Sequence, residues 1–149
     1  FINLQIYMIL ISHRGNIDGK DSDKENHPDY ILKALKLNYE VEVDVWFKNN
    51  EFYLGHDSPI YKIDVDFLTH NKLWCHAKNI EALKFLDKID CHYYWHQEDD
   101  VTITSRGYFW TYPGKKLTEK SICVLPETSN YDKIICAGIC SDVIENYKK

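Results

Sequence analysis

Residues 40–46 read Glu-Val-Glu-Val-Asp-Val-Trp, a strict alternation of polar and apolar side chains. This period of two predicts a β-strand with three valines on one face and the carboxylates Glu42 and Asp44 on the other. A half-solvated strand with its polar face in water explains the pattern in one way. The alternative is a buried strand whose paired carboxylates bind a hard divalent cation, because buried carboxylates ionise at high cost without a positive charge nearby.

Strands and helices alternate around this segment in the first half of the chain. This order favours a parallel sheet or an α/β barrel, in a single domain spanning residues 1–149. The second half has short strands joined by connectors with little helical pattern. We expect helices at 28–38 and 79–88, and strands at 7–12, 40–46, 51–54, 73–78, 92–96, 101–104, 108–112, 122–125 and 134–141.

Composition excludes several classes of protein. The chain has 18 Lys and Arg against 23 Asp and Glu, a net charge of −5, which does not suit non-specific nucleic-acid binding. Its five cysteines are odd in number and form no CxxC pair, so we expect a reducing, cytoplasmic location without disulfides or a zinc knuckle. The apolar residues 1–11 predict a buried strand and not a signal peptide, and no run is long enough to span a membrane.

Histidines follow two of the expected strands. His13, Arg14 and Gly15 come directly after the first strand, and Gly55-His56-Asp57 follows the strand at 51–54. Histidines at the carboxyl ends of strands are placed for acid–base chemistry, and an arginine there offers donors to a phosphate. Taken singly, each is as well explained by a solvated loop.

The order of these segments resembles the glycerophosphodiester phosphodiesterases and their phospholipase-like relatives, the phosphatidylinositol phospholipase C-like phosphodiesterases. The resemblance is strongest in the first third of the chain and weaker beyond it. Its motifs are His13-Arg14-Gly15, Glu25-Asn26, Glu42-Val43-Asp44-Val45 and Gly55-His56-Asp57, followed by Ala77-Lys78, Trp110-Thr111 and Gly138-Ile139-Cys140-Ser141-Asp142.

This resemblance implies a compact (β/α)8 TIM-type barrel with several outer helices shortened or missing. It also implies a metal-dependent phosphoric diester hydrolase that cleaves a small glycerophosphodiester-like substrate. In that scheme His13 and His56 are the acid–base pair and Arg14 and Lys78 bind the phosphate. Glu42 and Asp44 bind a divalent ion, most often Mg²⁺ or Ca²⁺, and the supporting residues are Glu25, Asn26, Asp57 and Trp110, with Glu25 a candidate hydrogen-bond partner of a catalytic histidine.

The chain departs from the family pattern at two points. His76 stands where the family has a third carboxylate ligand, and a nitrogen ligand shifts the preference toward Mn²⁺ or Zn²⁺. With only 149 residues, outer helices must be lost, and a second copy of the chain is a candidate cover for strand faces left bare. These departures leave two alternatives: a non-catalytic module that binds phosphate esters, and a lyase that forms a cyclic phosphate.

Aromatic strands in the second half have two explanations. His92, Tyr94 and His96 share one face of a strand, which lies either at the rim of the site or in solvent. Trp110 and Tyr112 either line a pocket for the alcohol group of a substrate or pack in the core.

Overall fold

The computed structural model describes residues 7–149, so the part of the expected N-terminal strand at 1–6 lies outside the described residues. This region contains three short α-helices and ten strands. The helices are α1 (Pro28–Lys36), α2 (Val65–Leu68) and α3 (Ile80–Leu86), with 3₁₀ segments η1 (Pro126–Thr128) and η2 (Ile144–Tyr147). The strands are β1 (Ile9–His13), β2 (Glu40–Lys48), β3 (Glu51–Leu54), β4 (Tyr61–Ile63), β5 (Leu73–Ala77), β6 (Tyr93–Tyr94), β7 (Val101–Ile103), β8 (Phe109–Thr111), β9 (Ser121–Val124) and β10 (Gly138–Ser141).

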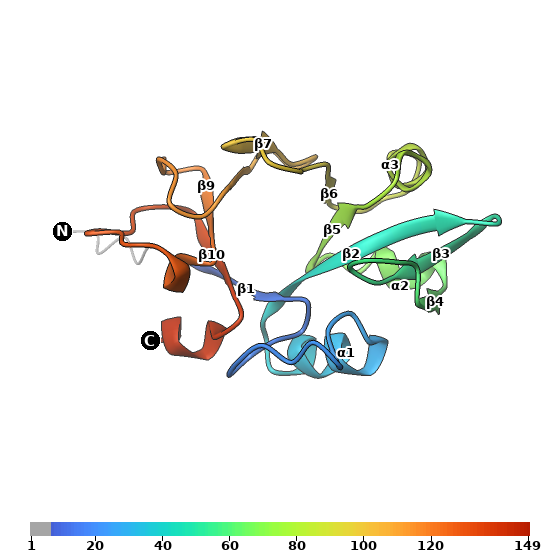
Figure 1. Cartoon of the computed structure of the whole chain (residues 1–149), viewed down its shortest axis with the longest axis horizontal. Helices are drawn as coiled ribbons and strands as arrows, with labels where there is room; N and C mark the ends of the chain where they lie inside the picture. Colours follow the sequence, from blue (N-terminus) through green and yellow to red (C-terminus); the bar gives the residue numbers. More distant parts are fainter. Residues whose placement is uncertain (1–6) are drawn as a thin grey trace.

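All ten strands belong to one mixed sheet that curls on itself. Parallel ladders run in the order β6-β5-β2-β1-β10-β9-β8, and β3, β4 and β7 join by antiparallel pairing. Within residues 7–149 no ladder joins β6 to β8, so the sheet stays open there. Figure 1 shows the curl, with β9 and β10 on one side, β5 and β6 on the other and β7 at the top.

The expected (β/α)8 TIM-type barrel is wrong, even in a form with outer helices shortened or missing. That fold places a helix after every strand, whereas this chain has three α-helices, and none follows α3 within residues 7–149. The connection from β8 to β9 is a loop, and β7 enters the sheet antiparallel to β8. The later connectors lack apolar residues at helical spacing, so they have no face with which to dock a helix on the sheet.

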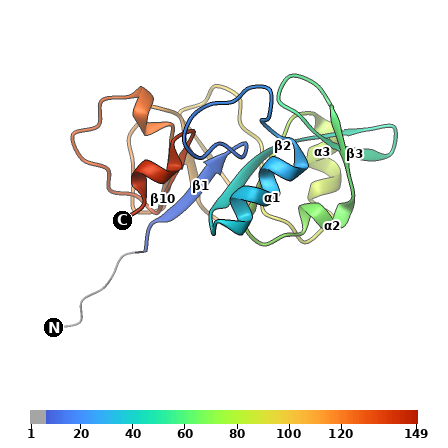
Figure 2. The same cartoon turned by 90° about the horizontal axis from the view of Figure 1, so that it is seen from below.

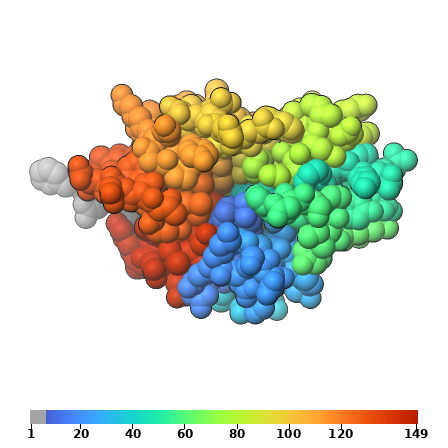
Figure 3. Space-filling view, in the orientation of Figure 1, coloured from blue at the N-terminus to red at the C-terminus, as the bar shows by residue number. Residues whose placement is uncertain are grey.

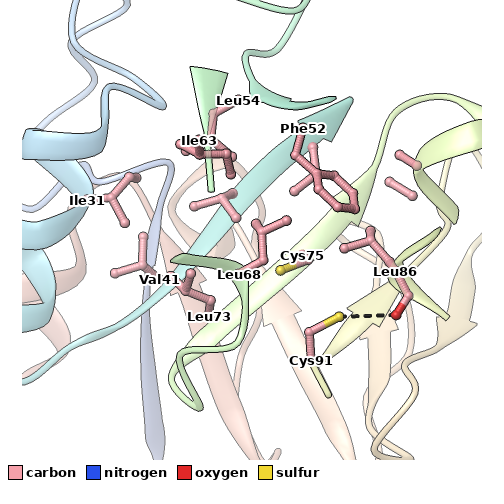
Figure 4. Packing of buried hydrophobic residues seen from close by; sticks show 14 of the residues in the cluster. Ile31, Val41, Phe52, Leu54, Ile63, Leu68, Leu73, Cys75, Leu86 and Cys91 are labelled. Atoms are coloured by element: carbon pink, nitrogen blue, oxygen red, sulfur yellow. Dashed lines mark hydrogen bonds between the residues drawn. The ribbon is translucent and has the colours of Figure 1, made fainter. Parts of the chain in front are cut away.

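One apolar core lies outside the sheet, beneath the helices. The outward side chains of β2 and β5, Val41, Val43 and Cys75 among them, are fully buried. They pack against Ile31 of α1 and Leu86 of α3. Figure 4 shows this packing together with the contact from the Cys91 thiol to the Leu86 carbonyl at 3.4 Å, and Figure 2 shows all three helices on the β2–β3 side of the molecule. The helices therefore support the strands that carry Glu42, Asp44 and His76.

Loops cover the outer face of the other half of the sheet. Outward residues of β9 and β10, Cys123 and Ile139, are buried against Ile144 of η2 and Tyr39. The strand faces expected to lie bare are thus covered by the chain itself, and a homo-oligomer stays a prediction. All five cysteines are buried free thiols.

The inside of the curl is filled mainly by large side chains. Ile11, Trp74, Tyr94, Trp110 and Ile122 form the inner cluster. In the space-filling view, side chains close over the centre of the ring of ribbons (Figure 3). None of the helices in the described part of the chain is long and apolar enough to cross a membrane.

Candidate active site

The turn after β1 brings His13 and Arg14 to the carboxyl edge of the sheet. Arg14 and Gly15 both have left-handed backbones, with φ of 60° and 95°, and the Asn16 N–H closes the turn on the His13 carbonyl at 3.0 Å. A side chain at Gly15 would collide with the ring of Tyr30, so only glycine fits this position. The Arg14 N–H donates to the Glu42 carbonyl at 3.0 Å, which joins the turn to β2.

Glu42 and Asp44 point into the curl, as the alternation predicts, and both are buried, with exposures of 1% and 0%. Burial, together with the charge of Asp44, raises the pKa of Glu42 well above its usual range. Burial alone would also raise the pKa of Asp44. The charge of Arg14 and the hydrogen bond from Asn26 outweigh it, and the pKa of Asp44 is lowered.

His76 faces these two carboxylates in a defined tautomer. Its Nε2 lies 2.8 Å from the His96 carbonyl oxygen, which can only accept a hydrogen bond, so Nε2 carries a proton. In the neutral imidazole the Nδ1 lone pair then points at Asp44 Oδ1, 3.3 Å away, and at Glu42 Oε1, 3.9 Å away. A backbone carbonyl on the second ring nitrogen is the usual support of a metal-binding histidine.

Glu42, Asp44 and His76 form a set that fits a divalent cation. Their ligand atoms lie within 4.8 Å of one another, and Glu42 Oε2 and Asp44 Oδ1 are buried without a hydrogen-bond donor. Charge also favours an ion: four carboxylates gather here against two cationic side chains, which leaves 2 − 4 = −2 with neutral histidines. The carboxylates are Glu25, Glu42, Asp44 and Asp142, and the cations are Arg14 and Lys78.

His13 is held by a carboxylate that the sequence reasoning quoted but did not place in the site. Asp142, directly after β10, lies 2.7 Å from His13 Nδ1, and hydrogen bonding from His13 overcomes burial to lower the pKa of Asp142. Because a carboxylate only accepts, Nδ1 carries the proton and Nε2 keeps its lone pair. Nε2 faces the same space as Glu42, with 3.7 Å to Glu42 Oε2.

Asparagines brace the carboxylates. Asn26 donates from Nδ2 to Asp44 Oδ2, and its Oδ1 accepts the Asp44 backbone N–H, both at 2.9 Å. Asn16 donates from Nδ2 to Glu25 and to Asp142, also at 2.9 Å. Glu25 therefore braces the site through Asn16, and Asp142 takes the place expected of Glu25 beside His13. Because Asn16 donates to both carboxylates, Glu25 and Asp142 can lie close together without a metal ion between them.

The two cations expected to bind phosphate lie close to the carboxylates. Arg14 Nε is 3.1 Å from Asp44 Oδ2, and Nη1 is 3.7 Å from Glu25. Burial opposes its charge, but Asp44, Glu42 and Glu25 together raise the pKa of Arg14, which stays protonated. Lys78 follows β5, its N–H donates to the Val45 carbonyl, and its charge acts on Glu42.

A cavity of about 190 Å³ brings polar and aromatic side chains together. Its charged and imidazole-bearing lining residues include His13, Arg14, Glu42 and His76. The rest of the lining is Tyr94, His96, Trp110, Tyr112, Pro113, Val124 and Leu125. Trp110 is thus buried in the core and also lines the cavity, while its contact with the alcohol group of a substrate stays a prediction.

Neither His56 nor Lys78 lines the cavity, and His56 lies apart from the carboxylates in an exposed loop. Its side chain is 43% exposed, and its Nδ1 lies 2.7 Å from Asp57, which is 93% exposed. The His56 side chain does not line the cavity that His13 lines. Gly55 ties this loop to β2, because its N–H donates to the Asp44 carbonyl at 3.1 Å.

Three residues contribute more to the site than the sequence indicated: Asn16, Tyr94 and Asp142. A polar Ser-Asp pair directly after an apolar strand signals the position of Asp142. Asn16 sits in a polar loop and carries no such signal. In comparisons with known proteins, no protein-family model, no curated protein and no solved structure matches this chain.

Proposed function

We propose that this chain is a divalent-metal-dependent phosphodiesterase acting on a small, glycerophosphodiester-like ester. One observation carries the proposal: unpartnered carboxylate oxygens of Glu42 and Asp44 face the lone pair of His76, and Glu42 and His76 line a cavity together with His13. When bound by Glu42, Asp44 and His76, the ion would supply positive charge to the phosphate oxygens. The mixed oxygen and nitrogen set favours Mn²⁺ among the ions expected.

His13 is the group suited to proton transfer. Asp142 holds its Nδ1–H, so Nε2 is oriented toward the cavity and accepts a proton from a water molecule or a substrate hydroxyl. The same carboxylate stabilises the imidazolium that forms. Asn16 in turn fixes the orientation of Asp142, which keeps the nitrogen aimed at the cavity.

One cation in the cavity wall and one near Glu42 complement the phosphate. Arg14 lines the cavity while Asp44 and Glu25 hold its guanidinium, which restricts the direction of its remaining N–H groups. Lys78 adds a charge near Glu42. Without a bound ion the excess of carboxylates would repel a phosphate, so the proposal requires metal dependence.

The test is turnover of a panel of glycerophosphodiesters with Mg²⁺, Ca²⁺, Mn²⁺ or EDTA, with His13→Ala as the blank. We expect release of the alcohol that depends on the ion and falls about a hundredfold or more in the variant. Analysis of the products separates hydrolysis from formation of a cyclic phosphate. Binding of glycerol phosphate with no turnover under any ion would favour the binding module and overturn the enzyme.

A further inference from the structure

Tyr94 carries a buried polar atom that the fold leaves unused. The residue is 2% exposed, and its hydroxyl has no hydrogen-bond partner. Its ring stacks on His76, with centroids 4.9 Å apart and planes 13° apart, and packs against Trp110 at 4.5 Å. Packing therefore explains the ring but not the hydroxyl, since a phenylalanine would fill the same space without leaving a polar atom unpaired.

The position of this hydroxyl connects it to the site. Tyr94 lines the same cavity as His13, Glu42 and His76. The charges of Glu42, Asp44 and Arg14 all act on its hydroxyl, which therefore lies near the charged groups of the site. Glu42, which also lines the cavity, has a buried oxygen without a hydrogen bond, Oε2, so two unpaired polar atoms belong to residues of one cavity.

We propose that the Tyr94 hydroxyl is a substrate-binding group that donates its hydrogen bond to a non-bridging oxygen of the phosphate ester. This inference rests on the proposed function and adds a ligand contact from β6, in the cavity that His13 also lines. A phenol keeps its proton at neutral pH, so the group serves as a donor. An oxygen that carries negative charge is the acceptor such a donor suits best.

Tyr94→Phe removes the hydroxyl and keeps the ring, so it separates ligand binding from packing. We expect the variant to unfold at the same temperature as the wild type or higher, because it loses no hydrogen bond within the protein. Calorimetry with glycerol phosphate in the presence of Mn²⁺ should show affinity about tenfold weaker or more. The stabilisation produced by Mn²⁺ alone should be unchanged, because Glu42, Asp44 and His76 remain.

Tyr108→Phe is the matched control. Tyr108 packs against Trp74 in the inner cluster but does not line the cavity, so this variant should bind glycerol phosphate as the wild type does. Equal affinity of the Tyr94→Phe and wild-type proteins would overturn the inference and leave the proposed function standing. A lower melting temperature in Tyr94→Phe would assign the hydroxyl a structural hydrogen bond and also overturn it. A wild-type protein that binds no glycerol phosphate with Mn²⁺, Mg²⁺ or Ca²⁺ would overturn both proposals.

Discussion

Replacing Glu42 by glutamine should stabilise the protein in the absence of metal and destroy its response to metal. The Glu42 carboxylate is 1% exposed, its Oε2 has no donor, and its nearest histidine nitrogens lie 3.7 and 3.9 Å away. A glutamine has nearly the same shape and carries no charge. The substitution therefore replaces a buried carboxyl, whose charged form burial disfavours, with a neutral amide and opens no cavity.

The size of this effect follows from the burial of the carboxylate. An unsatisfied buried polar group costs about 1–3 kcal/mol, and the lost attraction to Arg14 and Lys78 offsets part of the gain. We therefore expect the free energy of unfolding in EDTA to rise by about 1–2 kcal/mol. For a chain of this length that is an increase of about 2–8 °C in melting temperature.

Metal should make the wild type more stable than the Glu42→Gln protein. An ion at about one hundred times its dissociation constant stabilises the folded state by about 2.7 kcal/mol, which exceeds the advantage of the variant. Wild-type protein titrated with Mn²⁺ should thus overtake the Glu42→Gln protein, whose melting temperature should stay nearly constant. Thermal and urea unfolding in EDTA and in Mn²⁺ measure both quantities.

Glu119→Gln serves as the control for loss of a carboxylate, because Glu119 is exposed and lies outside the cavity. Its stability and Mn²⁺ response should match the wild type within about 0.5 kcal/mol. A Glu42→Gln protein that is less stable than the wild type in EDTA would refute the premise of an unpaired charge. A full Mn²⁺ response in that variant would refute the metal site.

Three further predictions test the histidines and their partners. Asp142→Asn should lower turnover about a hundredfold or more by turning His13 Nε2 into the protonated nitrogen, with the Mn²⁺ response intact; wild-type turnover would refute the dyad. The family resemblance predicts comparable losses of turnover for His13→Ala and His56→Ala. The exposed position of His56 instead predicts less than about a tenfold loss for His56→Ala, and the ratio of the two kcat values decides between these predictions. Burial, aided by Arg106, lowers the pKa of His92 from 6.5 to about 4, so the unfolded chain takes up a proton more readily. Urea unfolding should therefore show stability falling by up to about 3 kcal/mol between about pH 6.5 and pH 4, and falling less in His92→Gln, whose side chain gains no proton.

Local pattern predicted much of the first half of the fold. The valines of β2 do pack under the helices, and α1 starts at Pro28, as its sequence indicates. The segments β4 and α2 were missed because three or four residues show no clear period. The strand expected at 134–141 shrinks to Gly138–Ser141, since its first residues cover the sheet instead of joining it.

What local pattern could not predict depends on contacts between distant segments. The dyad of His13 and Asp142 joins residues 129 positions apart, and it exists because Ser12 pairs with Ser141 in the ladder of β1 and β10. Tyr94 lies in a strand of two residues, too short for periodicity to assign its face. Local pattern did indicate the lack of later helices, since it predicted none beyond residue 88. The barrel was wrong because the resemblance extended a fold from the first third of the chain to the rest.

The helices lie behind the part of the sheet that carries the charged side chains of the site. Buried carboxylates are tolerated only where their backbone is held rigidly, because a small shift would separate them from their partners. α1 and α3 pack behind β2 and β5, the two strands that carry Glu42, Asp44 and His76. β8, β9 and the loops after them supply aromatic and aliphatic wall residues, which need close packing but no exact alignment. A sheet covered by helices on one side and by loops on the other can therefore still hold a charged site, provided that the helices remain behind the strands that bear the charge.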